Sequence, residues 1–360
     1  MREDIEPFVD EIERGLSAPD KTLAAISAAA LQSKTLPPLR EIVPELIVQG
    51  LTIIGSPPKY GKSWMVLDLC LSVSTGTPFL GFPTRSCGCL YLALEDSERR
   101  LKNRLGKLLD GGQAPENFYF ATSASSTDTG LFEELNRFRV DHPDVGLIVI
   151  DTLQKVRGSS YGRDGSYAAD YREMGELKSF ADRENLAVVV VHHLRKMSDD
   201  ADPFNRISGT AAVSGAADSM VVLTREKRGA DTTTLTATGR DIDSVSLELS
   251  FDTDSCRWRN LGDTEQLRAK RAFEDYDKNP VVVTLRCLIG KSTDSRWIGR
   301  AGELMNAGRR FVGEELALSN QALAAELSRL EPQLLQYDSL VHQVMSGGTG
   351  GKRHLIAYRP

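Results

Sequence analysis

Short apolar runs alternate with longer amphipathic stretches through the central part of the chain. The short runs are rich in Val, Ile and Leu and are typical of strands buried on both faces, whereas the stretches between them have the apolar spacing of helices. Strands are predicted at 51–54, 89–94, 118–121, 147–150, 186–191, 219–223, 233–237 and 246–251, and helices at 62–75, 97–109, 130–140 and 167–184. This order predicts an α/β fold with a mainly parallel sheet, and the last three strands predict an antiparallel extension.

The two ends of the chain have a different pattern. Residues 4–15 and 19–31 predict two short amphipathic helices, which end before a proline-rich hinge at Leu36-Pro37-Pro38. At the other end, helices are predicted at 263–278, 280–290, 297–307 and 319–331, and 334–345 leads through the glycine-rich turn 346–351 into a strand at 352–358.

Helices followed by a glycine-rich turn and a terminal strand favour a small winged-helix-like domain, in which one helix enters a DNA groove. The alternative is a helical domain for oligomerisation or protein binding. We therefore expect an N-terminal helical segment (1–38), an α/β core (39–260) and a C-terminal winged-helix-like domain (261–360).

Composition narrows the class of protein. The chain has 360 residues, 41% hydrophobic and 26% charged, which predicts folded domains with a sizeable core. No apolar run is long enough to span a bilayer, and the acidic start is unlike a signal peptide, so we expect a cytoplasmic protein with no membrane contact. The net charge of −6 leaves room for a local basic surface, and residues 261–360 carry 14 basic and 12 acidic side chains. Cys87 and Cys89 form a lone C-x-C, short of the four ligands of structural zinc.

The strongest motif follows the run 51–54. The segment Gly55-Ser-Pro-Pro-Lys-Tyr-Gly-Lys-Ser63 lies between a predicted strand and a predicted helix, where backbone N–H groups surround phosphates. Lys62 is expected to reach the β- and γ-phosphates and Ser63 to ligate Mg²⁺, so the cofactors are ATP and Mg²⁺. Gly55 and Gly61 are separated by five residues where four are usual. Either Ser56 takes the place of the first glycine, or the loop has one extra residue.

Two acidic residues also follow predicted strands. Asp151 ends the run 147–150, the arrangement of a Walker B acid that holds Mg²⁺. Glu95 ends the run 89–94 and is our candidate for polarising the attacking water. The alternative for Glu95 is an acid at the start of the next helix, a position that Asp96 fills well.

Polar residues at a third strand end complete the pattern. His192 and His193 follow 188–191, where a side chain can sense the γ-phosphate, and the alternative is a buried structural histidine. Two segments rich in Gly, Ser, Asp and basic residues, 155–167 and 195–206, are candidates for gripping DNA. The alternative for both is a flexible surface loop.

These four elements, in this order, resemble the RecA-like ATPases and, within them, the RepA-type and DnaB-type replicative helicases. The resemblance runs from about Leu39 to Asp252 and is greatest to the RepA-like AAA-family ATPases of plasmids, prophages and other mobile elements. It implies a homo-oligomeric ring, expected to be a hexamer, with ATP bound between neighbours and single-stranded DNA through the centre. The function implied is an ATP-dependent DNA helicase or translocase in the replication of a mobile element.

The resemblance also implies roles for individual residues. Lys62 and Ser63 match the Walker A pair, Glu95 the catalytic acid, Asp151 the Walker B acid and His193 the γ-phosphate sensor. Arg240 matches the arginine finger that reaches a neighbour's nucleotide, although Arg206, Arg225 and Lys227 remain open for that role. The residues expected to contact the nucleotide are Gly55, Ser56, Pro58, Lys59, Gly61, Lys62, Ser63, Trp64 and Arg206.

Other functions stay open at this point. One is an ATP-gated DNA-binding regulator or initiator, in which the C-terminal domain recognises DNA. Another is a recombinase-like ATPase that forms filaments. A kinase of small metabolites is disfavoured because the sequence has no segment typical of a substrate lid.

Overall fold

The computed structural model describes residues 23, 25–158, 166–194, 202–207, 211–225, 229–346 and 352–359. The chain divides into two units after Leu39. In the first unit, the described helix is α2 (Ala28–Ser33), and its N-cap Ser27 accepts a hydrogen bond from the Ala30 amide. The helix predicted at 4–15 and the start of the helix predicted at 19–31 lie outside the described residues, and residues 25–27 are not helical. No side chain of α2 is buried. None of the described helices has the length and apolar character to cross a membrane.

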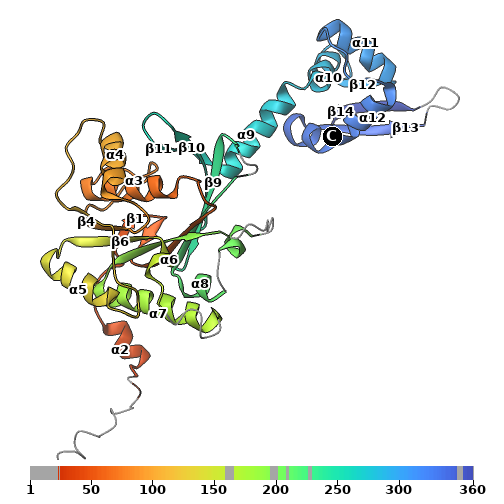
Figure 1. Ribbon diagram of the computed structural model, residues 1–360. Coiled ribbons are helices and arrows are strands. Elements are labelled where there is room, and N and C mark those ends of the chain that lie inside the picture. Colours follow the sequence, from red (N-terminus) through yellow and green to blue (C-terminus); the bar gives the residue numbers. More distant parts are fainter. Residues whose placement is uncertain are drawn as a thin grey trace, which may run out of the picture. The chain divides into compact units, whose positions relative to one another are not determined.

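A nine-stranded sheet organises the second unit, in the order β11-β10-β9-β8-β3-β7-β6-β4-β5 (Figure 1). Its strands are β3 (Gly50–Ser56), β4 (Gly88–Ala93), β5 (Phe118–Ala121), β6 (Val145–Asp151), β7 (Ala187–His193), β8 (Ser219–Thr224), β9 (Thr232–Gly239), β10 (Val245–Asp252) and β11 (Arg257–Asp263). Strands β8, β3, β7, β6, β4 and β5 are parallel, and β9, β10 and β11 are antiparallel. The predicted mainly parallel sheet is confirmed.

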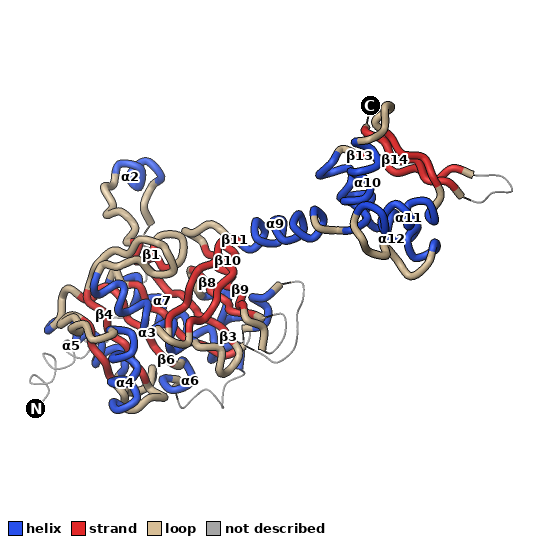
Figure 2. The backbone as a smooth tube through the Cα atoms, turned by 90° about the horizontal axis from the view of Figure 1, so that it is seen from above, coloured by secondary structure: helices blue, strands red, loops and turns tan. Residues whose placement is uncertain are grey.

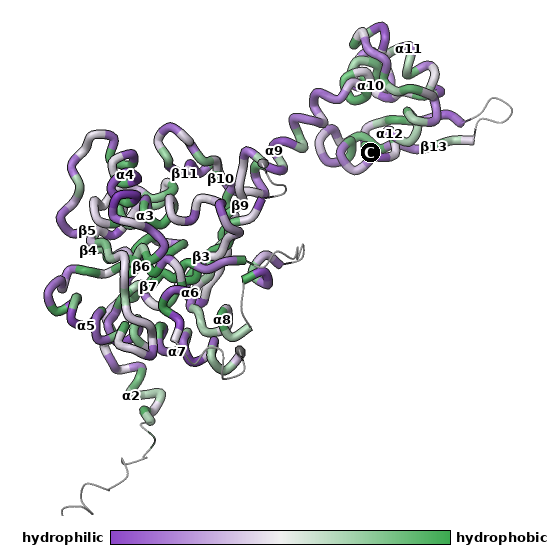
Figure 3. Tube along the Cα trace, viewed as in Figure 1, coloured by the Kyte–Doolittle hydropathy of each residue, from purple (hydrophilic) through white to green (hydrophobic). Residues whose placement is uncertain are grey.

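Helices cover both faces of this sheet (Figure 1). One face carries α3 (Lys62–Thr75) and α4 (Glu98–Leu109), and the other carries α5 (Leu131–Asp141), α6 (Leu153–Val156), α7 (Ser166–Glu184) and α8 (Ala211–Ala216). Two hydrophobic clusters fill the two layers, because alternate side chains of each strand point to opposite faces. In β3, for example, Leu51 and Ile53 belong to one cluster and Ile54 to the other. Figure 3 shows hydrophobic residues concentrated in these central strands.

The antiparallel part of the sheet differs from the prediction. Strand β8 was expected to be antiparallel, yet it pairs parallel to β3, with Ile54 opposite Val221. Its side chains enter both hydrophobic clusters, as in the other parallel strands. The structure adds β11, which no alternation of apolar residues marks in the sequence. A two-stranded ribbon, β1 (Glu41–Val43) and β2 (Ile47–Val48), is also additional.

The C-terminal part has its own hydrophobic cluster, which draws on residues from Tyr276 to Ile356. Its elements are α9 (Thr264–Asp277), α10 (Pro280–Gly290), β12 (Arg296–Gly299), α11 (Ala301–Phe311), α12 (Asn320–Asp338), β13 (Leu340–Met345) and β14 (Arg353–Tyr358). The three strands form a sheet in the order β12-β14-β13. Figure 2 labels β13 and β14 of this sheet and the helices α10, α11 and α12. The helix predicted at 297–307 is wrong at its start. Ile298 pairs with Leu355 of β14, and the helix begins only at Ala301.

Candidate nucleotide-binding site

The carboxyl ends of four parallel strands meet around one cavity. The strand register brings these ends together, because Ser56 pairs with His193 and Ala93 with Asp151. The cavity has a volume of about 540 Å³. Its lining residues are Pro58, Lys59, Tyr60, Gly61, Lys62, Ser63, Trp64, Glu95, Arg104, Asp151, Thr152, His193, Arg225, Phe251 and Trp258. Lys62, Ser63, Glu95, Asp151 and His193, predicted from separate motifs, therefore lie together.

The end of strand β3 determines which residues form the phosphate-binding loop. Strand β3 continues through Ser56, and Gly55 pairs with His192 inside the sheet. Ser56 therefore takes the place of the first glycine, and the loop has no extra residue. Glycine at position 55 is instead explained by packing, since a Cβ there would lie 2.8 Å from the Leu194 side chain. Gly55 and Ser56 are buried behind the loop and are not among the residues that line the cavity.

Helix α3 begins directly at the loop. Gly61 is its N-cap residue with φ +83°, a left-handed conformation that suits glycine. The first turn of α3 points its free backbone N–H groups at the cavity, which is the usual way that helix N-termini bind phosphate.

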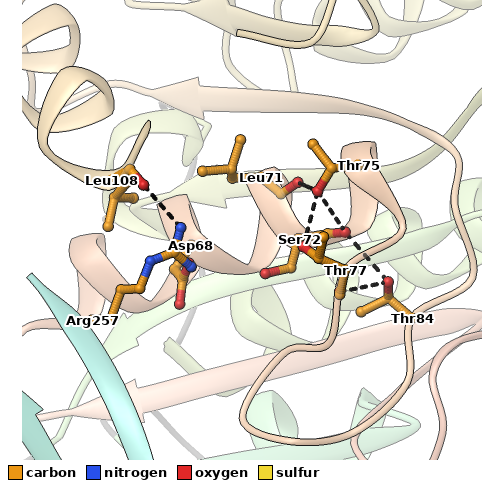
Figure 4. Close-up of polar contacts among 8 residues, drawn as sticks. All are labelled: Asp68, Leu71, Ser72, Thr75, Thr77, Thr84, Leu108 and Arg257. Carbon is orange, nitrogen blue, oxygen red and sulfur yellow. Dashed lines mark hydrogen bonds and ion pairs between the residues drawn. The ribbon is translucent and has the colours of Figure 1, made fainter. Parts of the chain in front are cut away.

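Trp258 of β11 packs against this turn. Its Nε1 donates a hydrogen bond to the Gly61 carbonyl at 3.3 Å, and a Cβ at position 61 would lie 3.0 Å from the indole ring. The neighbouring Arg257 forms an ion pair with Asp68 of α3 and donates to the Leu108 carbonyl at 2.9 Å (Figure 4). Strand β11 is thereby held against α3 and the end of α4.

The ammonium of Lys62 is turned toward the loop. Its Nζ donates to the carbonyls of Ser56 at 2.9 Å and Pro57 at 3.2 Å, and lies 3.4 Å from Nδ1 of His193. Burial lowers the pKa of Lys62 to about 8, although Asp151 and Glu95 act in the opposite direction. Lysine with such a pKa is still mainly charged at neutral pH and is placed to bind phosphate oxygens.

Asp151 fits the role of a Mg²⁺ ligand. Burial raises the pKa of its carboxyl group, and hydrogen bonds from Tyr91 and Ser63 partly offset this effect. Tyr91 Oη donates to Asp151 Oδ2 at 2.8 Å and thereby orients the carboxylate. A serine hydroxyl beside a carboxylate is the oxygen donor set that Mg²⁺ prefers. Tyr91 was not predicted from the sequence. The feature of the sequence that could have identified Tyr91 is its hydroxyl group in an otherwise apolar buried strand.

The two acids after β4 have separate environments. Glu95 lines the cavity, where Thr152 Oγ1 donates to its Oε1 at 3.3 Å. Asp96 instead forms ion pairs with Arg100, at 2.6 Å, and Arg104. Ser97 is the N-cap of α4 and accepts from the Arg100 amide. Glu95 is therefore not needed to cap the helix, and its carboxylate faces the candidate phosphate site.

The environment of His193 favours its neutral imidazole. Burial and then the charge of Lys62 lower its pKa below the ordinary value for histidine. The preceding His192 is buried and does not line the cavity. A neutral imidazole next to Lys62 is able to exchange a hydrogen bond with a terminal phosphate, the arrangement that a sensor needs.

Aromatic side chains form the other side of the cavity: Tyr60, Trp64, Phe251 and Trp258. The guanidinium of Arg225 lies 4.8 Å from the Tyr60 ring, and that of Arg104 lies 5.4 Å from the Trp64 ring. Flat, apolar surfaces flanked by cations suit the stacking of a nucleobase. Phe251 and Trp258 were not predicted, because nothing near them in the sequence connects them to a loop almost 200 residues earlier.

Two predicted arginines do not line this cavity. Arg240 follows the end of the antiparallel β9, where Gly239 pairs with Ser219 at the start of β8. It therefore lies at the edge of the sheet opposite Lys62, with its amide bonded to the Asp218 carbonyl and its side chain 58% exposed. Arg206 ends the short helix η2 (Pro203–Arg206), away from the lining residues. Lys227 and the segments 159–165 and 195–201 lie outside the described residues.

Known proteins share parts of this sequence and fold. Residues 18–199 match the family described as AAA domain. A solved structure titled "The Structure Of A DnaB-Like Replicative Helicase And Its Interactions With Primase" matches with a TM-score of 0.52 and 15% identity, over 72% of each chain. A second solved structure, whose title describes an ATPase domain, matches with a TM-score of 0.49 and 14% identity, over 72% of this chain and 99% of that one. No match was found among curated proteins. The chain thus shares its fold with a DnaB-like replicative helicase.

Proposed function

Because this chain belongs to the AAA domain family, we propose that it is an ATPase that drives a DNA helicase or translocase acting on single-stranded DNA. The observation that carries the proposal is the convergence of Lys62, Ser63, Glu95, Asp151 and His193 around one cavity. Together these residues supply what phosphoryl transfer to water requires. They are a phosphate-binding lysine, two side chains with oxygen ligands for a metal ion, a base and a residue that senses the terminal phosphate.

Each residue has a distinct role in hydrolysis. Lys62 binds the β- and γ-phosphates together with the N-terminus of α3, and Ser63 and Asp151 hold Mg²⁺. Bound Mg²⁺ supplies neutralisation of phosphate charge. Glu95, oriented by Thr152, accepts a proton from the attacking water, and His193 contacts the terminal phosphate. The aromatic side, with Tyr60 and Trp258, stacks against the adenine ring.

A ring of identical subunits, expected to be a hexamer, is the assembly that we propose. Arg240 lies at the end of the sheet opposite its own nucleotide site, and its exposed side chain is 3.5 Å from Asp218. We propose that this arginine contacts the nucleotide of a neighbouring subunit. The relative titled as a DnaB-like replicative helicase supports the proposed helicase function. We further propose that the DNA on which the protein acts belongs to a mobile genetic element.

The C-terminal part supports a DNA-related role. Its order of elements, α10-β12-α11-α12-β13-β14, is a helix, a strand, two helices and a two-stranded wing, as in winged-helix domains. We therefore keep 261–360 as a proposed winged-helix-like domain, beside the proposed core 39–260 and N-terminal segment 1–38.

The test of this function is ATP hydrolysis by the full chain with and without single-stranded DNA. A motor is expected to be stimulated by DNA and to keep that stimulation when residues 261–360 are deleted. If DNA binding is lost altogether on deletion, the regulator or initiator is the better account. If electron microscopy with a non-hydrolysable ATP analogue gives open filaments in place of closed rings, the recombinase-like account is favoured.

A mixing experiment tests the shared site. Lys62→Ala and Arg240→Ala each inactivate a homogeneous ring if both residues are needed. Mixed rings contain some sites that combine an intact Lys62 with an intact Arg240 from the neighbour. Activity recovered on mixing supports action in trans, whereas two inactive proteins that stay inactive when mixed oppose it.

A further inference from the structure

Asp218 lies directly before β8, at the end of the sheet opposite the nucleotide cavity, and its side chain is 9% exposed. Its Oδ2 accepts a hydrogen bond from the Leu51 amide at 2.9 Å. A Cβ at position 50 would lie 2.5 Å from this oxygen, so Gly50 lets the carboxyl group approach β3. The Asp218 carboxylate is therefore fixed to the strand that leads into the phosphate-binding loop.

The other carboxylate oxygen faces two cations. Asp218 Oδ1 lies 2.5 Å from Nζ of Lys178, a residue of α7, and 3.5 Å from Nη1 of Arg240. Arg240 also donates from its amide to the Asp218 carbonyl at 2.8 Å, and from Nη2 to the Gly215 carbonyl at 3.3 Å. Asp218 thus holds both the backbone and the guanidinium of Arg240.

The two cations are held unequally. Lys178 makes the short contact with Asp218 and Arg240 the long one, and the Arg240 side chain is 58% exposed. A buried carboxylate that loses its partner is strongly destabilising. Because Lys178 stays beside Asp218, Arg240 is able to turn outward without leaving that carboxylate unpaired. The arrangement therefore orients the arginine without trapping it.

Orientation of Arg240 matters because an exposed arginine has many side-chain conformations. Fixing one of them for a reaction costs conformational entropy, and a small error in the placement of a catalytic group slows a reaction strongly. The contacts with Asp218 and Gly215 remove part of this freedom before a phosphate arrives. A role of Asp218 in folding alone would need its contacts with Leu51 and Lys178, but not the one with the guanidinium.

We propose that Asp218 is a positioning residue for Arg240, that Lys178 balances its charge, and that Asp218 directs the guanidinium toward the nucleotide of a neighbouring subunit. The inference rests on the proposed function in one respect, the action of Arg240 in trans. It requires neither DNA nor strand separation, so ATP turnover alone tests it.

The first measurement is steady-state ATP turnover by Asp218→Asn in the full chain. The amide oxygen still accepts from Leu51, but the negative charge beside Arg240 is lost. We expect kcat to fall about tenfold with KM nearly unchanged, because the phosphate-binding groups of the subunit itself are intact. The control is Asp182→Asn, which removes a second carboxylate from Lys178, at 3.3 Å, and is expected to keep full turnover.

Mixed rings separate positioning from a structural defect. Asp218→Asn subunits have an intact Lys62, and Lys62→Ala subunits have a correctly held Arg240. Turnover per Asp218→Asn subunit is expected to rise to nearly the wild-type value with excess Lys62→Ala, and not to rise with Arg240→Ala. A defect within the Asp218→Asn subunit itself would be repaired by neither partner. Absence of a rise with Lys62→Ala therefore overturns the proposal.

If Asp218→Asn does not fold, Lys178→Gln replaces it. Without the lysine, the Asp218 carboxylate draws Arg240 inward, so turnover is expected to fall and to recover on mixing with Lys62→Ala. Full turnover by Lys178→Gln contradicts the proposal.

The pair of Lys62→Ala and Arg240→Ala distinguishes this inference from the proposed function. Recovery in that pair, without recovery when Lys62→Ala is mixed with Asp218→Asn, overturns the inference and leaves the proposed function standing. No recovery in either pair overturns the shared site as well.

Discussion

The Nζ atom of Lys62 lies 3.4 Å from Nδ1 of His193, although 131 residues separate them in the chain. Burial lowers the pKa of both groups, and the charge of Lys62 lowers the pKa of His193 further. Phosphate binding raises the pKa of Lys62, because an anion favours the charged ammonium.

Nucleotide binding is therefore expected to take up protons near pH 8. In the free protein the pKa of Lys62 is about 8, so close to half of the molecules have a neutral lysine at that pH. Bound phosphate raises this pKa, which means that affinity falls as pH rises through 8. Calorimetry with Mg-ATP in buffers of different ionisation enthalpy measures the uptake. We expect uptake at pH 8 and much less at pH 7, and equal values would show that Lys62 does not titrate with binding.

Replacement of Glu95 by glutamine is expected to separate binding from hydrolysis. The variant keeps the size of the side chain and the contact with Thr152 but loses the base, so turnover should fall by about 10²–10³-fold with nucleotide affinity nearly unchanged. The control is Asp96→Asn, whose carboxylate is bonded to Arg100 and Arg104 outside the chemistry. Should Asp96→Asn lose turnover while Glu95→Gln keeps it, the two roles are reversed.

Intrinsic fluorescence is expected to report nucleotide binding. Of the three tryptophans in the sequence, Trp64 and Trp258 line the cavity, whereas Trp297 packs against the hydrophobic cluster of the C-terminal part. Added ATP should change the emission of the wild type and of Trp297→Phe alike. The change should shrink in Trp64→Phe and in Trp258→Phe. A signal that depends on Trp297 instead would place nucleotide elsewhere.

Burial of the Asp68 carboxyl group, which is paired with Arg257, makes stability depend on pH (Figure 4). Burial raises the folded-state pKa of Asp68 to about 6, against an ordinary value of 3.8, even though Arg257 acts in the opposite direction. A raised pKa in the folded state favours folding below the unfolded pKa, and this contribution is lost as pH rises through the folded pKa.

Asp68→Asn removes that titration. Between pH 5 and pH 7, the stability of wild type relative to Asp68→Asn is expected to fall by about 1 kcal/mol. Urea unfolding of both proteins at the two pH values gives the difference directly. A difference that stays constant with pH would mean that the carboxyl group of Asp68 has an ordinary pKa.

The sequence predicted the residues on the phosphate side of the cavity more completely than those on the nucleobase side. Lys62, Glu95, Asp151 and His193 each follow an apolar run, and the carboxyl ends of parallel strands share an edge, so local patterns were sufficient. Trp258 reaches Gly61 from β11, a strand without regular alternation, and its contact depends on the packing of Arg257 against α3. Long-range packing of this kind leaves no local signal.

Two further differences also depend on strand pairing between distant parts of the chain. The spacing of Gly55 and Gly61 left the length of the loop open, and only the pairing of Ser56 with His193 decided it. The error at 297–307 arose because the four-residue strand β12 is too short for a periodic pattern, and it exists through its pairing with β14. The sequence therefore predicted the longer elements of the central sheet, but neither the short strand β12 nor the pairing partners of the strands.

The most direct test of the central claim is strand separation on a forked DNA by the full chain with Mg²⁺ and ATP, run beside Lys62→Ala. The account predicts that wild type separates the strands and hydrolyses ATP faster with single-stranded DNA, and that Lys62→Ala does neither. Wild-type protein that hydrolyses ATP but shows neither strand separation nor stimulation by DNA, or Lys62→Ala that hydrolyses ATP normally, would contradict it.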